Sequence, residues 1–217
     1  MNIRAVIFDM DGLLFDTENL FLRYAHETEK EIGYTIPHHL CIETIGRTVE
    51  DTRRIFLENL GRDFPVESFF KLTNEMVYDH IGRHGIPVKP GAEDLLKELK
   101  HLCLKTILAS SSPYWMIDKN LTAAGLKSYF DLIVSGEEVE HGKPAPDIFL
   151  LAAERGEVSP DDCMVLEDSN NGVLSAIAAG MRTIMVPDVK APLPEAERSA
   201  YKILPSLTAV RSLVLNW

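Results

Sequence analysis

Short apolar runs separated by helical patterns constrain the fold of this chain more than any other feature of the sequence. Each run is continuous rather than alternating, as expected for strands that are buried on both faces of a parallel sheet. The segments between the runs have apolar residues at helical spacing, which is typical of crossover helices joining parallel strands. The sequence therefore predicts an α/β fold with a Rossmann-like parallel sheet. The expected strands are 5–8, 104–109, 132–134, 164–166, 183–186 and 201–204.

The region 17–87 interrupts this alternation, because one helical pattern follows another without a strand-like run between them. A block of helices placed between the first strand and the rest of an α/β chain predicts an inserted cap. We therefore expect an α/β core domain formed by 1–16 and 88–217, with a helical cap domain at 17–87. The helices of the cap are expected at 18–32, 49–60 and 66–81.

The charge balance bears on the partners of the protein. The 217 residues include 22 Lys and Arg against 33 Asp and Glu, which gives a formal net charge of −11. Such a chain lacks the basic surface that nucleic-acid binding requires. No apolar segment is long enough to cross a bilayer, and the stretch before Asp9 is too short for a signal peptide. Cys41, Cys103 and Cys163 lack a metal-binding spacing. We expect a cytoplasmic protein that binds neither nucleic acid nor membrane.

Polar side chains follow several of the expected strands. Because ligands of open parallel sheets bind outside the carboxyl ends of the strands, we expect these side chains to converge. Taken singly, each also has an ordinary explanation as a turn residue, a helix cap or a solvated loop residue. They are Asp9 and Asp11 after the first strand, Ser110, Ser111 and Ser112 after the second, Glu167 and Asp168 after the fourth, and Lys143 in the segment before the fourth.

Caps and turns do not explain why one sheet edge would gather three or more carboxylates. Two unit charges at about 4 Å repel by roughly 4 kcal/mol at an effective dielectric constant near 20. Asp9, Glu167 and Asp168 would therefore destabilise the fold unless a cation lies among them. Mg²⁺ fits such hard oxygen ligands best, together with a substrate phosphate. With Ser110 and Lys143 as donors to phosphate, the pattern favours phosphoryl transfer.

These segments resemble the four ordered motifs of the haloacid dehalogenase (HAD) superfamily. The motifs are 9–12, Ser110, Lys143 with Pro144, and Glu167 with Asp168, and the resemblance extends from Ile3 to Val186. The sequences of 8–18 and 142–147 are similar to those of the subgroup of sugar phosphatases and β-phosphoglucomutases. That subgroup has a small helical cap after the first motif.

The resemblance implies a Mg²⁺-dependent phosphatase of small phosphorylated metabolites, sugar phosphates above all, and a monomeric protein. Asp9 would attack phosphorus and form an aspartyl-phosphate. Asp11 would protonate the leaving alcohol and then activate water. Ser110, Ser111 and Lys143 would bind the transferring phosphoryl group. The implied metal ligands are Asp9, Asp168, the backbone carbonyl of Asp11, and Glu167 either directly or through water.

Substrate specificity in this subgroup depends on the cap. The resemblance implies specificity residues in the loop that contains Gly46 and Arg47. A solvated surface arginine explains Arg47 equally well. Glu18, at the first connection to the cap, is a weaker candidate.

Three other functions remain to be weighed. β-Phosphoglucomutases resemble this chain at the motifs, but they carry a His where Phe21 stands and an Arg where Val49 stands, so simple hydrolysis is favoured. Dehalogenases lack a second acid at the position of Asp11. A non-catalytic regulator that binds a phosphorylated metabolite would not need Asp9, Asp11, Lys143 and Asp168 together, and all four are present.

Overall fold

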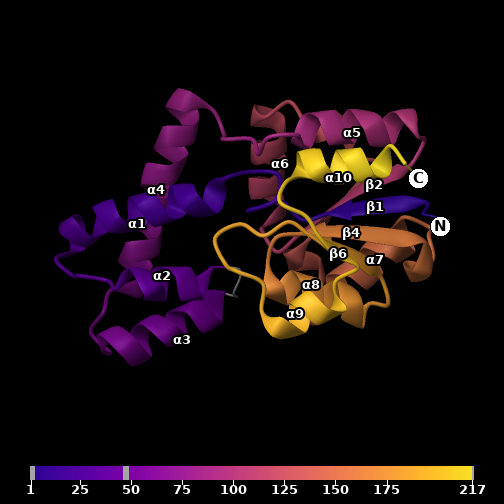
Figure 1. Ribbon diagram of the computed structural model, residues 1–217. Helices are drawn as coiled ribbons and strands as arrows, with labels where there is room; N and C mark the ends of the chain where they lie inside the picture. Colours follow the sequence, from indigo (N-terminus) through magenta and orange to yellow (C-terminus); the bar gives the residue numbers. More distant parts are fainter. Residues whose placement is uncertain (1–2, 46–48, 217) are drawn as a thin grey trace. The chain divides into compact units, whose positions relative to one another are not determined.

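The computed structural model of the chain describes residues 3–45 and 49–216, without the side chain of Val49. The chain divides into two compact units (Figure 1). One unit consists of Met1–Phe15 together with Val88–Trp217, and the other consists of Asp16–Pro87.

The larger unit is built on a six-stranded sheet in which every neighbouring pair is parallel. The strand order is β3-β2-β1-β4-β5-β6, so the first strand lies in the middle. This sheet confirms the predicted α/β fold. The strands are β1 (Ala5–Phe8), β2 (Lys105–Ser110), β3 (Leu132–Ser135), β4 (Cys163–Glu167), β5 (Arg182–Met185) and β6 (Lys202–Ile203).

Helices cover both faces of this sheet (Figure 1). Helices α5 and α10 pack together on one face, and α7 and α8 pack on the other. On the second face, Ile107 and Val165 from the strands join Phe149 and Ala176 from the helices in one buried cluster. The α-helices are α5 (Ala92–His101), α6 (Tyr114–Ala123), α7 (Asp147–Arg155), α8 (Asn170–Ala178), α9 (Pro194–Ser199) and α10 (Leu207–Val214), and the short 3₁₀ helices are η1 (Lys127–Tyr129), η2 (Gly136–Glu138) and η3 (Pro160–Asp162).

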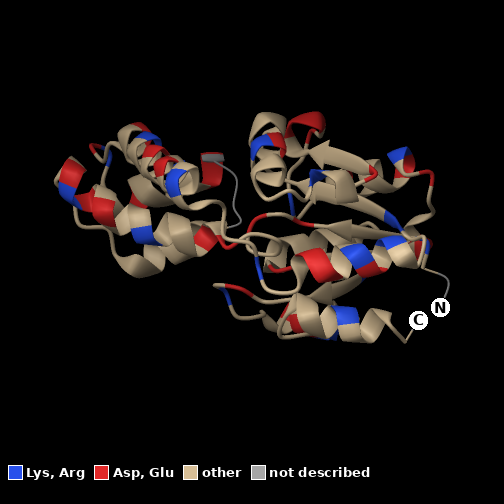
Figure 2. Cartoon of the chain, turned by 90° about the horizontal axis from the view of Figure 1, so that it is seen from above, with Lys and Arg blue, Asp and Glu red and all other residues tan. Residues whose placement is uncertain are grey.

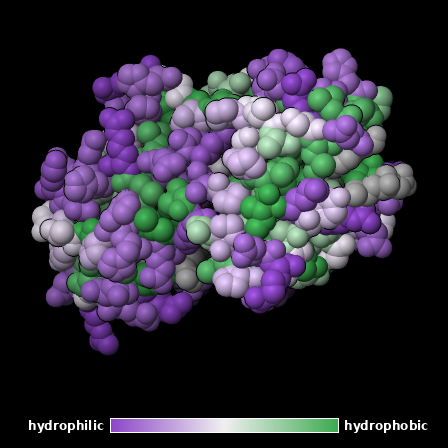
Figure 3. Space-filling model, viewed as in Figure 1, coloured by the Kyte–Doolittle hydropathy of each residue, from purple (hydrophilic) through white to green (hydrophobic). Residues whose placement is uncertain are grey.

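The smaller unit is helical. Its helices are α1 (Thr17–Ile32), α2 (His38–Thr44), α3 (Val49–Leu60) and α4 (Val66–His84). Phe56, Phe64 and Phe69 form its buried aromatic centre, and the rings of Phe56 and Phe69 meet edge to face at 5.3 Å. Hydrophilic side chains cover most of this unit on the face shown in Figure 3. Each helix therefore turns an apolar stripe inward and a polar stripe outward.

The two connections to the helical segment run side by side. Phe15 and Val88 form an antiparallel bridge, and the Lys89 N–H donates to the Leu14 carbonyl at 2.8 Å. The Asp16 N–H donates to the Pro87 carbonyl, also at 2.8 Å. The inserted segment therefore leaves and returns at nearly one point, which allows β1 to keep its place in the sheet.

Acidic and basic residues are interspersed along the helices of both units (Figure 2). Among the described residues, no helix combines the length and the apolar character needed to cross a membrane.

Candidate active site

The candidate site lies at the carboxyl ends of the three central strands. Phe8, at the end of β1, is paired with Leu108 in β2 and with Leu166 in β4. Asp9 is the next residue after Phe8, and its N–H donates to the Leu166 carbonyl at 3.0 Å. Because parallel strands end at the same edge, this register brings Asp9 level with Glu167. The structure therefore brings together Asp9 and Glu167, which are 158 positions apart in the chain.

Lys143 lies at the centre of the site. Its Nζ atom donates to Asp9 Oδ1 at 2.5 Å and to Glu167 Oε1 at 2.7 Å. A third, longer bond at 3.3 Å reaches the Ala109 carbonyl in β2. The side chain is buried, and its ammonium lies 4.9 Å from the centre of the Phe149 ring in α7. Lys143 thus ties the ends of β1, β2 and β4 together through one charged group.

Glu167 is held from two sides. Oxygen Oε1 accepts from Lys143, while Oε2 accepts from the Ser169 N–H at 2.8 Å and from Ser169 Oγ at 2.9 Å. Ser169 is also the N-cap of α8, since its Oγ accepts from the Gly172 N–H at 3.0 Å. One serine therefore fixes both the helix terminus and the carboxylate. The contact between Ser169 and Glu167 could not be read from the sequence.

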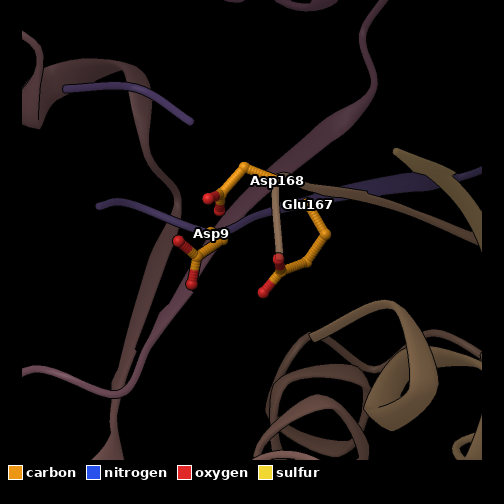
Figure 4. A group of neighbouring side chains, drawn as sticks. All are labelled: Asp9, Glu167 and Asp168. Atoms are coloured by element: carbon orange, nitrogen blue, oxygen red, sulfur yellow. The ribbon is translucent and has the colours of Figure 1, made fainter. Parts of the chain in front are cut away.

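The buried carboxylates of Asp9, Glu167 and Asp168 converge at this site (Figure 4). Oxygen atoms of Asp9, Glu167 and Asp168 lie within 4.8 Å of one another. Burial is the largest influence on Asp9 and raises the pKa of its carboxyl to about 7, against the opposing effect of the Lys143 ammonium. For Lys143, burial favours the neutral amine, but the charges of Asp9 and Glu167 outweigh it and raise the pKa of the ammonium. A cluster of hard oxygen donors in which a buried carboxylate is costly to ionise is suited to hold a divalent cation.

Asp11 is contacted by Ser112, one of the three serines that the sequence places after the second strand. Ser112 Oγ donates to Asp11 Oδ2 at 2.8 Å. The pattern of a serine before Pro113 suggested a helix cap, yet the N-cap of α6 is Pro113 and no side chain caps this helix. Ser112 is thus available to the site, and the serine segment contributes a contact to the candidate acid.

The other predicted site residues lie in three different settings. Ser110 is buried at the last position of β2, and Ser111 beside it is exposed. The predicted strand ended one residue earlier, at position 109. Glu18 belongs to the first turn of α1 in the helical unit. Gly46 and Arg47 lie outside the described residues.

A further carboxylate was missed. Asp188 lies in the loop after β5, pairs with Lys89 at 2.6 Å, and has an oxygen within 4.8 Å of a carboxylate oxygen of Asp168. The rule that located the other residues would have found it, because Asp188 also follows the carboxyl end of a strand of this sheet.

The fold and the site define an α/β enzyme whose buried carboxylates and lysine gather at the carboxyl edge of a parallel sheet. The chain belongs to the haloacid dehalogenase-like hydrolase family, whose model matches residues 6–186. This match confirms the predicted family.

Relatives and solved structures agree with this assignment. The chain is 34% identical over 185 residues to the phosphorylated carbohydrates phosphatase of Thermotoga maritima, covering 84% of each chain. It is 32% identical over 193 residues to hexitol phosphatase B of Escherichia coli K12, covering 85% of this chain and 84% of the relative. The structure of CbbY from Rhodobacter sphaeroides in complex with phosphate has a TM-score of 0.79 and 28% identity, with 96% of each chain covered. The predicted class of enzyme, a phosphatase of this hydrolase family, is confirmed by these relatives.

Proposed function

We propose that this protein is a Mg²⁺-dependent phosphatase that hydrolyses small phosphorylated metabolites, sugar phosphates in particular, through an aspartyl-phosphate. The observation that carries the proposal is the buried group in which Lys143 bonds to Asp9 while Glu167 and Asp168 converge on the same point. This group provides a nucleophile, a fixed cation and oxygen donors for a metal within one small volume.

The metal would be held by the carboxylates of Asp9 and Asp168, by the backbone carbonyl of Asp11, and by Glu167 directly or through water. When bound, Mg²⁺ would neutralise charge on the phosphate oxygens. Glu167 already accepts hydrogen bonds from Lys143 and Ser169, which favours contact through water.

Asp9 would be the nucleophile. Its carboxylate oxygen forms a bond to phosphorus while the bond from phosphorus to the alcohol oxygen breaks. Asp11, in its protonated form, gives its proton to the departing oxygen. In the second half of the reaction Asp11 removes a proton from water, the water oxygen bonds to phosphorus, and Asp9 is released.

Lys143, Ser110 and Ser111 would bind the phosphoryl oxygens. Phosphoryl transfer depends mainly on positioning and on stabilisation of charge. Because Lys143 is held by two carboxylates and the Ala109 carbonyl, its ammonium needs little rearrangement to face a phosphate.

The substrate would be a small phosphorylated carbohydrate. The relatives named above act on phosphorylated carbohydrates and hexitol phosphate, as their names state. We propose that 17–87 forms the cap domain and that 1–16 with 88–217 forms the core domain. Gly46, Arg47 and Glu18 are the proposed specificity residues of the cap. We also propose that the protein acts as a cytoplasmic monomer, without a nucleic-acid or membrane partner.

Hydrolysis is favoured over a mutase reaction by the surroundings of Phe21. Its ring packs against Phe69 and Phe70, each at 6.3 Å between ring centres. A side chain used for apolar packing in the helical unit does not supply the histidine that the mutases carry at this position. A regulator that binds without turnover is disfavoured because the full set of charged groups is retained.

The test is phosphate release from a panel of phosphorylated sugars, hexitols, nucleotides and phosphoglycolate, with Mg²⁺ and with EDTA. We expect metal-dependent release from sugar or hexitol phosphates, and no turnover by Asp9→Asn, whose amide cannot act as the nucleophile. β-Glucose 1-phosphate belongs in the panel. Its conversion to glucose 6-phosphate without net phosphate release would instead identify a mutase, and binding without turnover would identify a regulator.

A further inference from the structure

The loop between β2 and α6 is fixed by hydrogen bonds that lead to Asp11. The Ser112 N–H donates to Ser110 Oγ at 3.1 Å, and the Ser112 carbonyl accepts from Ser135 Oγ at 2.8 Å. Ser135 is itself buried and accepts from the Glu137 N–H at 3.2 Å as the cap of η2. The backbone of Ser112 is therefore held on both sides, from β2 and from the end of β3.

Close backbone packing adds to this restraint. A Cβ atom built at Gly136 would lie 2.7 Å from the Ser111 carbonyl oxygen, so η2 approaches the serine loop as closely as only glycine allows. Because the loop is restrained at Ser110, Ser111 and Ser112, a displacement of its backbone would break these hydrogen bonds and contacts. The Ser112 hydroxyl is thus presented from a fixed backbone.

The Ser112 hydroxyl uses this fixed position to bind one oxygen of Asp11. The bond from Ser112 Oγ to Asp11 Oδ2 is 2.8 Å long and joins residues 101 positions apart. Asp11 lies in the turn after β1, where the Gly12 N–H donates to the Phe15 carbonyl at 2.8 Å. Because Ser112 donates to Oδ2, the hydroxyl restrains the orientation of the Asp11 carboxyl plane.

We propose that Ser112 is a positioning residue for Asp11, which fixes the orientation of the acid that protonates the leaving alcohol. The proposal rests on the proposed function of Asp11 and extends it to a residue in a different segment of the chain. Ser112 differs in this from Ser110 and Ser111, whose proposed partner is the phosphoryl group. Its loss should therefore affect substrates according to how much their leaving group needs a proton.

The experiment compares kcat/KM for two substrates of the same enzyme. p-Nitrophenyl phosphate releases a stable anion and needs no general acid, whereas a sugar or hexitol phosphate, the best of the panel, releases an alcohol that does. Ser112→Ala is expected to lower kcat/KM about tenfold for the alcohol substrate, part of the 10²–10⁴ that general acids typically supply. For p-nitrophenyl phosphate the value should change less than about twofold, because binding of the phosphoryl group is unchanged. Ser112→Thr keeps the hydroxyl and should restore most of the selective loss.

Two further variants make the outcome decisive. Asp11→Asn should also lower kcat/KM more for the alcohol substrate than for p-nitrophenyl phosphate, and by a larger factor than Ser112→Ala does. If it does not, the proposed role of Asp11 is wrong. Ser212→Ala removes a serine hydroxyl of α10 that bonds to the Thr208 carbonyl, and it should leave both substrates unaffected. If Asp11→Asn is selective but Ser112→Ala lowers both substrates equally, or changes neither, the positioning role is wrong while the proposed function stands. Thermal unfolding of each variant shows whether the fold is retained.

Discussion

Glu167 lies so close to the backbone of Gly172 that any side chain at position 172 would have to displace it. A Cβ atom there would lie 1.7 Å from Glu167 Oε1 and 1.9 Å from its Cδ. The same carboxylate is held by Lys143 and Ser169, so it cannot simply swing away. The first turn of α8 and the charged centre of the site are therefore built as one unit.

This contact predicts the effect of Gly172→Ala. The methyl group must displace Glu167 from Lys143 and Ser169, at a cost of about 1–3 kcal/mol in unfolding free energy, as for other overpacked positions. Metal-dependent turnover should fall at least tenfold, because Lys143 loses one of its partners. Denaturant unfolding and the phosphate-release assay measure the two effects.

Gly82→Ala is the matched control. Gly82 lies within α4, and a Cβ atom there would have nothing within 4 Å. Because alanine favours helices, this change should leave activity intact and raise stability by roughly 0.5–1 kcal/mol. Equal activity of Gly172→Ala and Gly82→Ala would contradict the coupling of α8 to Glu167.

Replacing Lys143 should destabilise the protein in a way that Mg²⁺ partly reverses. Lys143→Met leaves the buried carboxylates of Asp9 and Glu167 without their common ammonium. Removing one partner of a buried ion pair costs about 3–5 kcal/mol. Since a cation bound among the carboxylates restores positive charge, the rise in melting temperature on adding Mg²⁺ should be larger for this variant than for the wild type. Turnover should be lost.

Lys127→Met is the control for this experiment, because the side chains of Lys127 and its partner Asp118 are 48% and 41% exposed. Its melting temperature, with Mg²⁺ and with EDTA, should match that of the wild type. A Lys143→Met protein as stable as the wild type in EDTA would show that the buried pairs contribute nothing to the fold.

The affinity for Mg²⁺ should fall as the pH is lowered. Burial raises the pKa of Asp9 to about 7, so below that pH the folded, metal-free protein keeps a proton on this carboxyl. Because the metal binds the charged form, it must displace the proton, and an affinity governed by a pKa near 7 should decrease about tenfold between pH 8 and pH 6. Titration calorimetry at several pH values measures this. The Asp9→Asn variant should bind Mg²⁺ more weakly at every pH, and its affinity should depend less on pH. If the pH dependence of this variant were unchanged, a group other than Asp9 would be its cause.

Thiol reactivity should separate the three cysteines. Burial is the main cause that raises the pKa of Cys41 and of Cys163 to about 11, with Glu29 and Asp162 adding to it, whereas Cys103 is exposed. Because the thiolate is the reactive form, iodoacetamide at pH 8 should modify Cys103 in the native protein and all three thiols after unfolding. Peptide mapping by mass spectrometry distinguishes the sites. Native modification of Cys41 or Cys163 as fast as that of Cys103 would show that these regions open.

Much of the fold follows from local sequence. Continuous apolar runs mark strands buried on two faces, and the polar residues after them mark one sheet edge, because both patterns depend on neighbouring residues. These patterns predicted that Asp9, Lys143, Glu167 and Asp168 lie together. In the structure Lys143 donates to Asp9 and Glu167, and oxygens of the three carboxylates lie within 4.8 Å of one another. Helix α2 was not expected, since it has seven residues, follows Pro37 and lacks a side-chain cap.

What only the tertiary structure decided is the direction of individual side chains. A helix cap was one explanation for Ser112, which in the structure donates to Asp11, while Ser169 serves both as a cap and as a donor to Glu167. The sequence does not distinguish Gly172 from other helical glycines, because its close contact with Glu167 appears only in the structure. The sequence determined which strand ends carry chemical groups, because strand and helix periodicities are local. The partners of those groups depend on loop paths and side-chain rotamers set by packing between distant segments.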